Sequence, residues 1–150
     1  MLSLIITVMS TYFSQDREHE SFLIHYNDEF EEKQRLETEF QEVFQFIEEC
    51  GLPEDSRAWR KSDLFTLLVE IHRALFKDEN NFKPIEAGKR LLRFYELVDK
   101  SAKADEDSGT ENDRLQEYYK AALQGTQSRS NRIRRGKIIQ DVINGNFQFD

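Results

Sequence analysis

Apolar residues recur at spacings of three and four along most of this 150-residue chain, and this period constrains the fold more than any other feature. An α-helix places residues at such spacings along one face, whereas a half-buried strand needs alternation with a period of two. No segment of the sequence alternates for long enough to predict a strand. We therefore predict an all-α fold, a bundle of about six helices.

Start and stop signals divide this pattern into elements. Residues 1–13 form an apolar run, and residues 16–49 form one kinked helix or two helices ended by Gly51 and Pro53. A polar loop follows at residues 54–61, and Trp59 is expected to anchor this loop to the core. Ile85 is expected to point inward from the helix that starts at Pro84. The remaining helices are predicted over residues 62–76, 84–102, 110–124 and 130–144.

Length and composition favour one helical domain over residues 1–150, with a linker-like stretch at 101–110. The only cysteine excludes an internal disulfide and a structural zinc site built on cysteine pairs, so we expect a cytoplasmic protein. The apolar run at residues 1–13 is shorter than the roughly 20 residues that span a membrane. No basic residue precedes Arg17, so we expect neither a membrane helix nor a secretion signal.

The chain has a formal net charge of −8, and its charged residues are distributed unevenly along the sequence. Residues 16–49 contain twelve acidic and three basic side chains, whereas the last 25 residues contain five basic and two acidic ones. A chain with this net charge repels a polyanion. Contact with nucleic acid would therefore have to be confined to the basic tail segment, or be supplied by a partner.

The segment of residues 127–137 is the strongest candidate for binding nucleic acid or a partner. On a helix Arg132 and Arg135 share one side, which Gly136 and Ile139 continue, and guanidinium groups near a helix N-terminus suit phosphate oxygens. Charge alone favours an alternative, in which this segment pairs with the acidic helix of residues 28–49, within the chain or across a dimer. The candidate residues are Arg129, Arg132, Arg134, Arg135 and Lys137.

The sequence lacks recognisable groups for catalysis or metal binding. His72 has no evident orienting partner, and the acidic residues around His19 and His25 lack a spacing such as H-E-x-x-H. No carboxylate is expected in an apolar setting that would tune it for acid–base chemistry. Cys50 follows Glu48 and Glu49, which are expected to raise its pKa. We expect no enzyme, no metal and no cofactor; an active site around His72 is a third hypothesis.

Three stretches carry a resemblance to a known family. They are residues 1–13 with the acidic segment FLIHYNDEFEEKQRLETEFQEVFQFIEECGL, the segment WRKSDLF from Trp59, and the closing YYKAALQGTQSRSNRIRRGKIIQDVI. Their order resembles the C-terminal helical region of the GmrS/GmrD-type restriction family. In that family such helices follow a ParB/sulfiredoxin-like domain with a D-G-Q-Q-R motif. This motif does not occur here, so no catalytic residue is carried over.

The resemblance implies a non-catalytic helical module of a prokaryotic GmrSD-like defence nuclease system, of the restriction–modification and phage-defence type. It further implies a fragment or split subunit of a larger helical domain, which contacts a partner subunit and the DNA backbone. The apolar N-terminal helix would then pack against a partner or a second copy through Leu2, Ile5, Ile6 and Met9. The alternative is a free-standing acidic adaptor or inhibitor that uses residues 28–49 as a nucleic-acid mimic.

Overall fold

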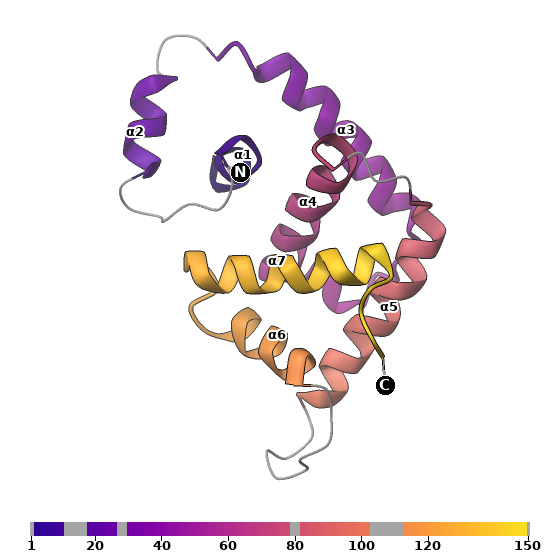
Figure 1. Ribbon diagram of the computed structural model, residues 1–150. Coiled ribbons are helices and arrows are strands. Elements are labelled where there is room, and N and C mark those ends of the chain that lie inside the picture. The colour runs from indigo at the N-terminus through magenta and orange to yellow at the C-terminus, as the bar shows by residue number, and fades with distance from the viewer. Residues whose placement is uncertain (1, 11–17, 27–29, 79–81, 103–112, 150) are drawn as a thin grey trace.

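The computed structural model describes residues 2–10, 18–26, 30–78, 82–102 and 113–149 (Figure 1). These residues form seven α-helices and one 3-10 turn, and none of them lies in a strand, so the all-α prediction is confirmed. Most of the linker predicted at 101–110 lies outside the described residues. The elements are α1 (Leu2–Ser10), α2 (Glu18–His25), α3 (Lys33–Glu49), η1 (Arg57–Trp59), α4 (Lys61–Phe76), α5 (Pro84–Ser101), α6 (Asp113–Leu123) and α7 (Arg129–Asn144).

Local signals explain where several helices begin and end. Of the two alternatives left open for the acidic segment, the described residues show two helices, α2 and α3. After α3, Gly51 adopts a positive φ of 65°, which a residue without Cβ tolerates. Ser128 caps the N-terminus of α7, since its side chain accepts a hydrogen bond from the amide of Asn131. Gly145 ends α7 in the left-handed conformation.

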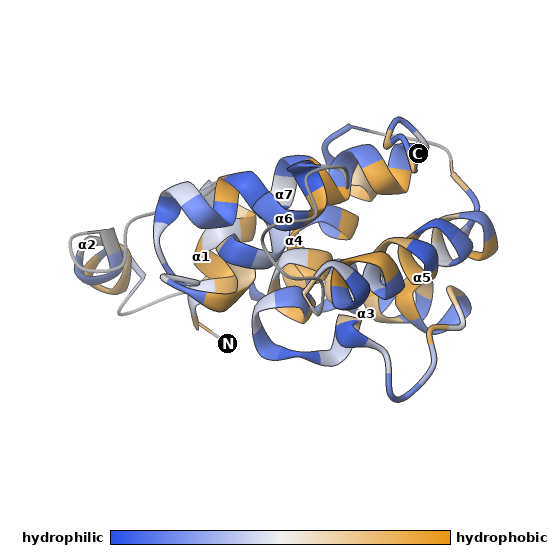
Figure 2. Cartoon of the chain, turned by 90° about the horizontal axis from the view of Figure 1, so that it is seen from below, coloured by the Kyte–Doolittle hydropathy of each residue, from blue (hydrophilic) through white to orange (hydrophobic). Residues whose placement is uncertain are grey.

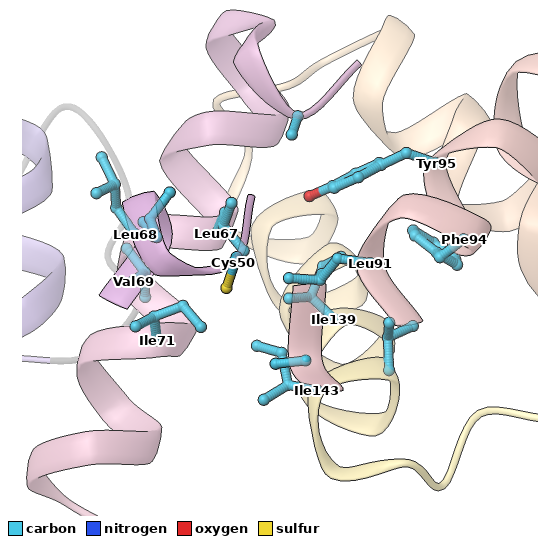
Figure 3. Packing of buried hydrophobic residues seen from close by; sticks show 14 of the residues in the cluster. Cys50, Leu67, Leu68, Val69, Ile71, Leu91, Phe94, Tyr95, Ile139 and Ile143 are labelled. Atoms are coloured by element: carbon cyan, nitrogen blue, oxygen red, sulfur yellow. The ribbon is translucent and has the colours of Figure 1, made fainter. Parts of the chain in front are cut away.

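The central element of the bundle is α4, which contacts α1, α3 and α7. All residues from Thr66 to His72 are buried, so this helix is enclosed on every side rather than along one stripe. Figure 2 shows hydrophobic residues of α1, α4 and α5 gathered in the middle of the molecule. In the close view of Figure 3, Leu67 and Ile71 of α4 face side chains of α5 and α7.

The apolar N-terminal helix is packed within the chain. Leu4 and Val8 of α1 belong to the main hydrophobic cluster, and Ile6 is only 1% exposed. Lys77, just after α4, donates a hydrogen bond of 2.9 Å to the carbonyl oxygen of Val8. The expectation that Ile6 is left bare for a partner or a second copy is therefore wrong: this chain covers it.

Two expectations about the core are wrong. The side chain of Trp59 is 41% exposed, and its Nε1 donates a hydrogen bond of 2.7 Å to the carbonyl oxygen of Pro53. The neighbouring Arg57 and Ala58 are buried in its place. Ile85 is 64% exposed because the inward face of α5 starts only at Ala87. Apolar character alone did not identify the buried residues of these segments.

Gly88 lets α5 cross very close to the C-terminal end of α3. A Cβ at this position would overlap the backbone carbonyl group of Cys50. Glycine inside a helix is about 1 kcal/mol less favourable than alanine. The close crossing is therefore the physical reason for a glycine at this position.

We predict that Gly88→Ala lowers the free energy of unfolding by about 1–3 kcal/mol, because the methyl group must displace backbone. This loss should appear in spite of the better helix propensity of alanine. Urea unfolding followed by circular dichroism measures it. Lys89→Ala, at an exposed position of the same helix, is the control and should change stability by no more than about 0.5 kcal/mol. A Gly88→Ala variant as stable as the parent would contradict the close crossing.

Candidate anion-binding site

The structure divides the five basic residues of the C-terminal segment between the surface and the interior. Arg129, Arg134 and Lys137 are exposed. Arg132 and Arg135 share one side of α7, as their spacing predicts, but that side faces inward, and they are only 4% and 1% exposed. The five side chains therefore do not form a single surface patch.

Arg135 joins α7 to two other helices. Its Nε donates to the hydroxyl of Thr66 on α4 at 3.0 Å, and its terminal nitrogens donate to the carbonyl oxygens of Ala121 and Thr126. All three acceptors are neutral oxygens on or beside α4 and α6. These bonds fix the guanidinium group without neutralising its charge.

Arg132 lies beside Arg135 and packs on an aromatic ring. Its guanidinium carbon is 4.7 Å from the centroid of the Phe65 ring, a cation–π arrangement. Burial, and then the charge of Arg135, lower the pKa of Arg132 below its ordinary value. Two cationic groups thus repel one another inside the protein, and a nearby anion would relieve this repulsion.

These two arginines line a cavity of about 570 Å³ between the N-terminal ends of α1, α4 and α7 and the C-terminal end of α6. In Figure 1, α6 leads into α7 on the side of the molecule where α1 lies. The volume is in the range of small-molecule sites. We call this space the basic cavity, because its charged lining consists of five cationic side chains and one carboxylate: Arg57, Arg60, Lys61, Arg132, Arg135 and Asp63.

The single carboxylate of the lining is held by two partners. Asp63 is fully buried, with Oδ2 3.2 Å from Nε of Arg57, and its Oδ1 accepts a hydrogen bond of 2.7 Å from the hydroxyl of Tyr118. Burial raises the pKa of Asp63, against the opposing effects of Arg57 and of the Tyr118 hydrogen bond. Arg57 also donates to Asp99 at 3.0 Å, so its guanidinium group is positioned by two carboxylates.

The N-terminus of α4 adds positive charge to the same cavity. Arg60 occupies the N-cap position and makes no capping hydrogen bond with its side chain, and Lys61 is the first helical residue. Cations are unfavourable at this end of a helix, because the backbone dipoles place partial positive charge there. The first backbone N–H groups of a helix also lack partners within it. Asp63 supplies one negative charge in the first turn of α4, and the cationic side chains around this helix end favour a further anion.

His72 has an orienting carboxylate that the sequence analysis did not find. Its Nε2 lies 2.6 Å from Oε2 of Glu39 on α3, and Arg35 donates to the other oxygen of that carboxylate at 2.7 Å. The His72 ring contacts the rings of Phe40 and Phe76 and is only 2% exposed as a residue. The pair is thus part of the core between α3 and α4.

Glu70 corrects the expectation that no carboxylate lies in an apolar setting. It is fully buried on α4, accepts a hydrogen bond of 2.6 Å from Gln140 of α7, and lies 3.3 Å from Arg73. Burial raises the pKa of Glu70 to about 7, against the effects of Arg73 and Gln140. The carboxyl group is therefore held close to its titration point at neutral pH.

The acidic segment is partly neutralised along its own helix. Arg35 of α3 pairs with Glu32 and Glu39 at 2.6 and 2.7 Å, and the exposed Lys33 lies 3.9 Å from Glu37. The contacts that the structure assigns to Arg134 and Arg135 are made instead with α4, α6 and the loop before α7. These contacts do not support the alternative in which basic and acidic segments pair within the chain.

Cys50 has the raised pKa that the sequence predicts, but the main cause is different. Burial raises the pKa of its thiol to about 11, and the charge of Glu49 adds to this effect.

Within the described ranges, no three His, Cys, Asp or Glu side chains come together as a group that could hold a metal ion. In the same part of the chain, no helix is both long and apolar enough to cross a membrane.

Sequence reasoning missed the half of the basic cavity that is formed by η1 and the start of α4. Arg57, Arg60 and Lys61 belong to a segment that was interpreted only as a polar loop. The signal that could have identified them is a cluster of cations directly before a strongly apolar helix, where a helix N-terminus favours anions.

Comparison with protein-family models, with curated proteins and with solved structures finds no match to this chain.

We predict that Glu70→Gln becomes more stable relative to the parent chain as the pH rises. The folded-state pKa of about 7 lies above the ordinary 4.5, so the stability that protonated Glu70 contributes is complete below about pH 4.5 and is lost as the pH rises through 7. Glutamine resembles the protonated form and avoids this loss. Between pH 5 and pH 8.5 the variant should gain about 1–3 kcal/mol, measured by urea unfolding at each pH.

Glu42→Gln, on the exposed side of α3, is the matched control, and its difference from the parent should not change over the same pH range. A stability difference for Glu70→Gln that is equal at both pH values would show that Glu70 is already ionised in the fold at pH 5.

Proposed function

We propose that the chain is a non-catalytic helical module of a prokaryotic GmrSD-like defence nuclease system, and that it contacts the DNA backbone and a partner subunit. The observation that carries the DNA contact is the lining of the basic cavity, in which five cationic side chains surround one carboxylate. The order of the sequence segments supports the system to which the module belongs.

Guanidinium groups suit phosphate because their planar N–H forks match two oxygens at once. Three of the five cations of the lining are arginines held in place by other parts of the chain. Arg60 and Lys61 are exposed and can meet a phosphate at the surface. Since the whole chain has a net charge of −8, attraction of DNA would be confined to this region.

A binding role rather than a catalytic one is supported by where the ionisable groups lie. Glu70 and His72 are closed into the core and do not belong to the lining of the basic cavity. The one carboxylate of the lining, Asp63, is engaged by Arg57 and Tyr118. The D-G-Q-Q-R motif of the catalytic domain does not occur in the sequence.

Contact with a partner subunit is supported by α2, which lies next to α1. Leu23 and Ile24 of this helix are 49% and 72% exposed. Neighbouring large apolar side chains at a surface mark protein–protein contacts more often than isolated ones do. The partner contact would therefore involve α2, beside the N-terminal helix that the resemblance implicates.

We predict that the chain binds duplex DNA with an affinity that falls as salt is added. The double variant Arg60→Gln/Lys61→Gln should bind more weakly, and its slope of log affinity against log salt should be smaller by about two, one for each phosphate contact removed. Fluorescence anisotropy with a labelled duplex over a salt series measures both quantities. Lys83→Gln/Lys89→Gln, two exposed lysines outside the cavity lining, is the control of equal charge change.

An equal loss in both double variants would show that only net charge matters and would contradict the site. No binding of DNA at low salt, together with binding of a basic protein, would favour the acidic adaptor instead. That interaction should weaken when Glu31 and Glu37, both exposed, are changed to glutamine.

A further inference from the structure

We infer that the basic cavity takes a terminal phosphate group, the phosphate monoester of a nucleic-acid end or of a nucleotide, while the exposed Arg60 and Lys61 of its lining keep the proposed contact with the DNA backbone. The inference rests on the proposed phosphate contact and specifies its ligand. The first reason is depth. Arg57, Arg132 and Arg135 are at most 4% exposed, so an anion reaches them only by entering the cavity.

An internal phosphate of a duplex is less able than a terminal phosphate to reach side chains as deeply buried as these arginines. It is joined to a sugar on both sides, and its neighbours along the strand repeat every few ångströms. A cavity of about 570 Å³ is in the size range of small-molecule sites and has room for a phosphate with one nucleoside attached. A terminal phosphate has only one such connection and can enter with its oxygens leading.

Charge is the second reason. A phosphate monoester carries about −1.5 to −2 near pH 7 and presents three acceptor oxygens, whereas a diester carries one negative charge. The lining contains five cations and one carboxylate. Outside the lining, Asp99 forms ion pairs with Arg57 and Arg60 and so partly neutralises their charge. A lining with this excess of cations attracts a dianion more strongly than a monoanion.

The donors are also arranged for several oxygens at once. A guanidinium group has five N–H donors, and Arg135 uses three of them in bonds to Thr66, Ala121 and Thr126. Those bonds hold the group rigidly in the lining of the cavity. Rigid placement reduces the entropy lost when the anion binds.

The cavity has an apolar wall beside its cations. Leu4 of α1, Phe65 of α4 and Ala122 with Leu123 of α6 line it together with the charged residues. Leu123 is 59% exposed. An anion with an attached organic group can place its phosphate on the arginines and the rest against this wall, which inorganic phosphate cannot do.

The test compares two labelled duplexes of one sequence, one with a 5′-phosphate and one with a 5′-hydroxyl end, by anisotropy at constant salt. We expect the phosphorylated duplex to bind about tenfold more tightly or better. Inorganic phosphate and adenosine 5′-monophosphate serve as competitors, with adenosine as their uncharged control. The competitor experiment separates a nucleic-acid end from a nucleotide as the source of the monoester.

The preference for the phosphorylated end should be lost in Arg132→Gln and reduced in Lys61→Gln. It should persist in Arg134→Gln, which removes an equal charge from the outer side of α7. Circular dichroism verifies folding. If Arg132→Gln does not fold, the exposed Lys61→Gln decides, and an unreduced preference in it overturns the site.

Equal affinity for the two duplexes, with no competition by adenosine 5′-monophosphate, overturns the inference. Salt-dependent binding of both duplexes would still support the proposed DNA contact. Competition or direct binding by adenosine 5′-monophosphate without any DNA binding would support the monoester site and remove the DNA function. Failure of every phosphate probe overturns both proposals.

Discussion

Burying α4 is the constraint on which the arrangement of the other helices depends. The helix is enclosed on all sides, yet it carries three ionisable side chains that are almost fully buried, Asp63, Glu70 and His72. An uncompensated buried charge costs several kcal/mol. Each group therefore requires a partner from a different element, and those partners determine which elements can lie against α4.

The partners come from around the whole bundle. Glu39 of α3 meets His72, Gln140 of α7 meets Glu70, and Asp63 is held by Arg57 of η1 and Tyr118 of α6. Hydrophobic contacts permit many rotations of one helix on another, whereas these bonds permit few. The polar groups of α4 thus fix the orientation of elements whose apolar faces supply most of the burial.

The helices follow from the sequence far better than the site does. Period, glycine and proline signals located α4 to α7 and the end of α3 within a few residues, because these signals are local. The pairs His72–Glu39 and Glu70–Gln140 join residues 33 and 70 positions apart, and no local pattern indicates such contacts. Trp59 was misplaced for the same reason, since its exposure depends on what the neighbouring segments cover.

The inward position of Arg132 and Arg135 could have been predicted. Their spacing places them on the side of α7 that Gly136 and Ile139 continue, and both of those residues are buried. An arginine on an apolar side of a helix is enclosed with it and needs acceptors in the interior. What the sequence could not provide is the second set of cations, because Arg57, Arg60 and Lys61 meet the arginines of α7 only in the folded chain.

The basic cavity contains repulsions between cations beside the attraction of Asp63 to Arg57 and Arg135. Arg132 and Arg135 repel each other in the interior, and Arg60 and Lys61 lie at the positive end of a helix. Apolar side chains of similar volume would fill such positions at least as stably. A bound anion changes this balance, because the repulsions among the cations become attractions to one ligand.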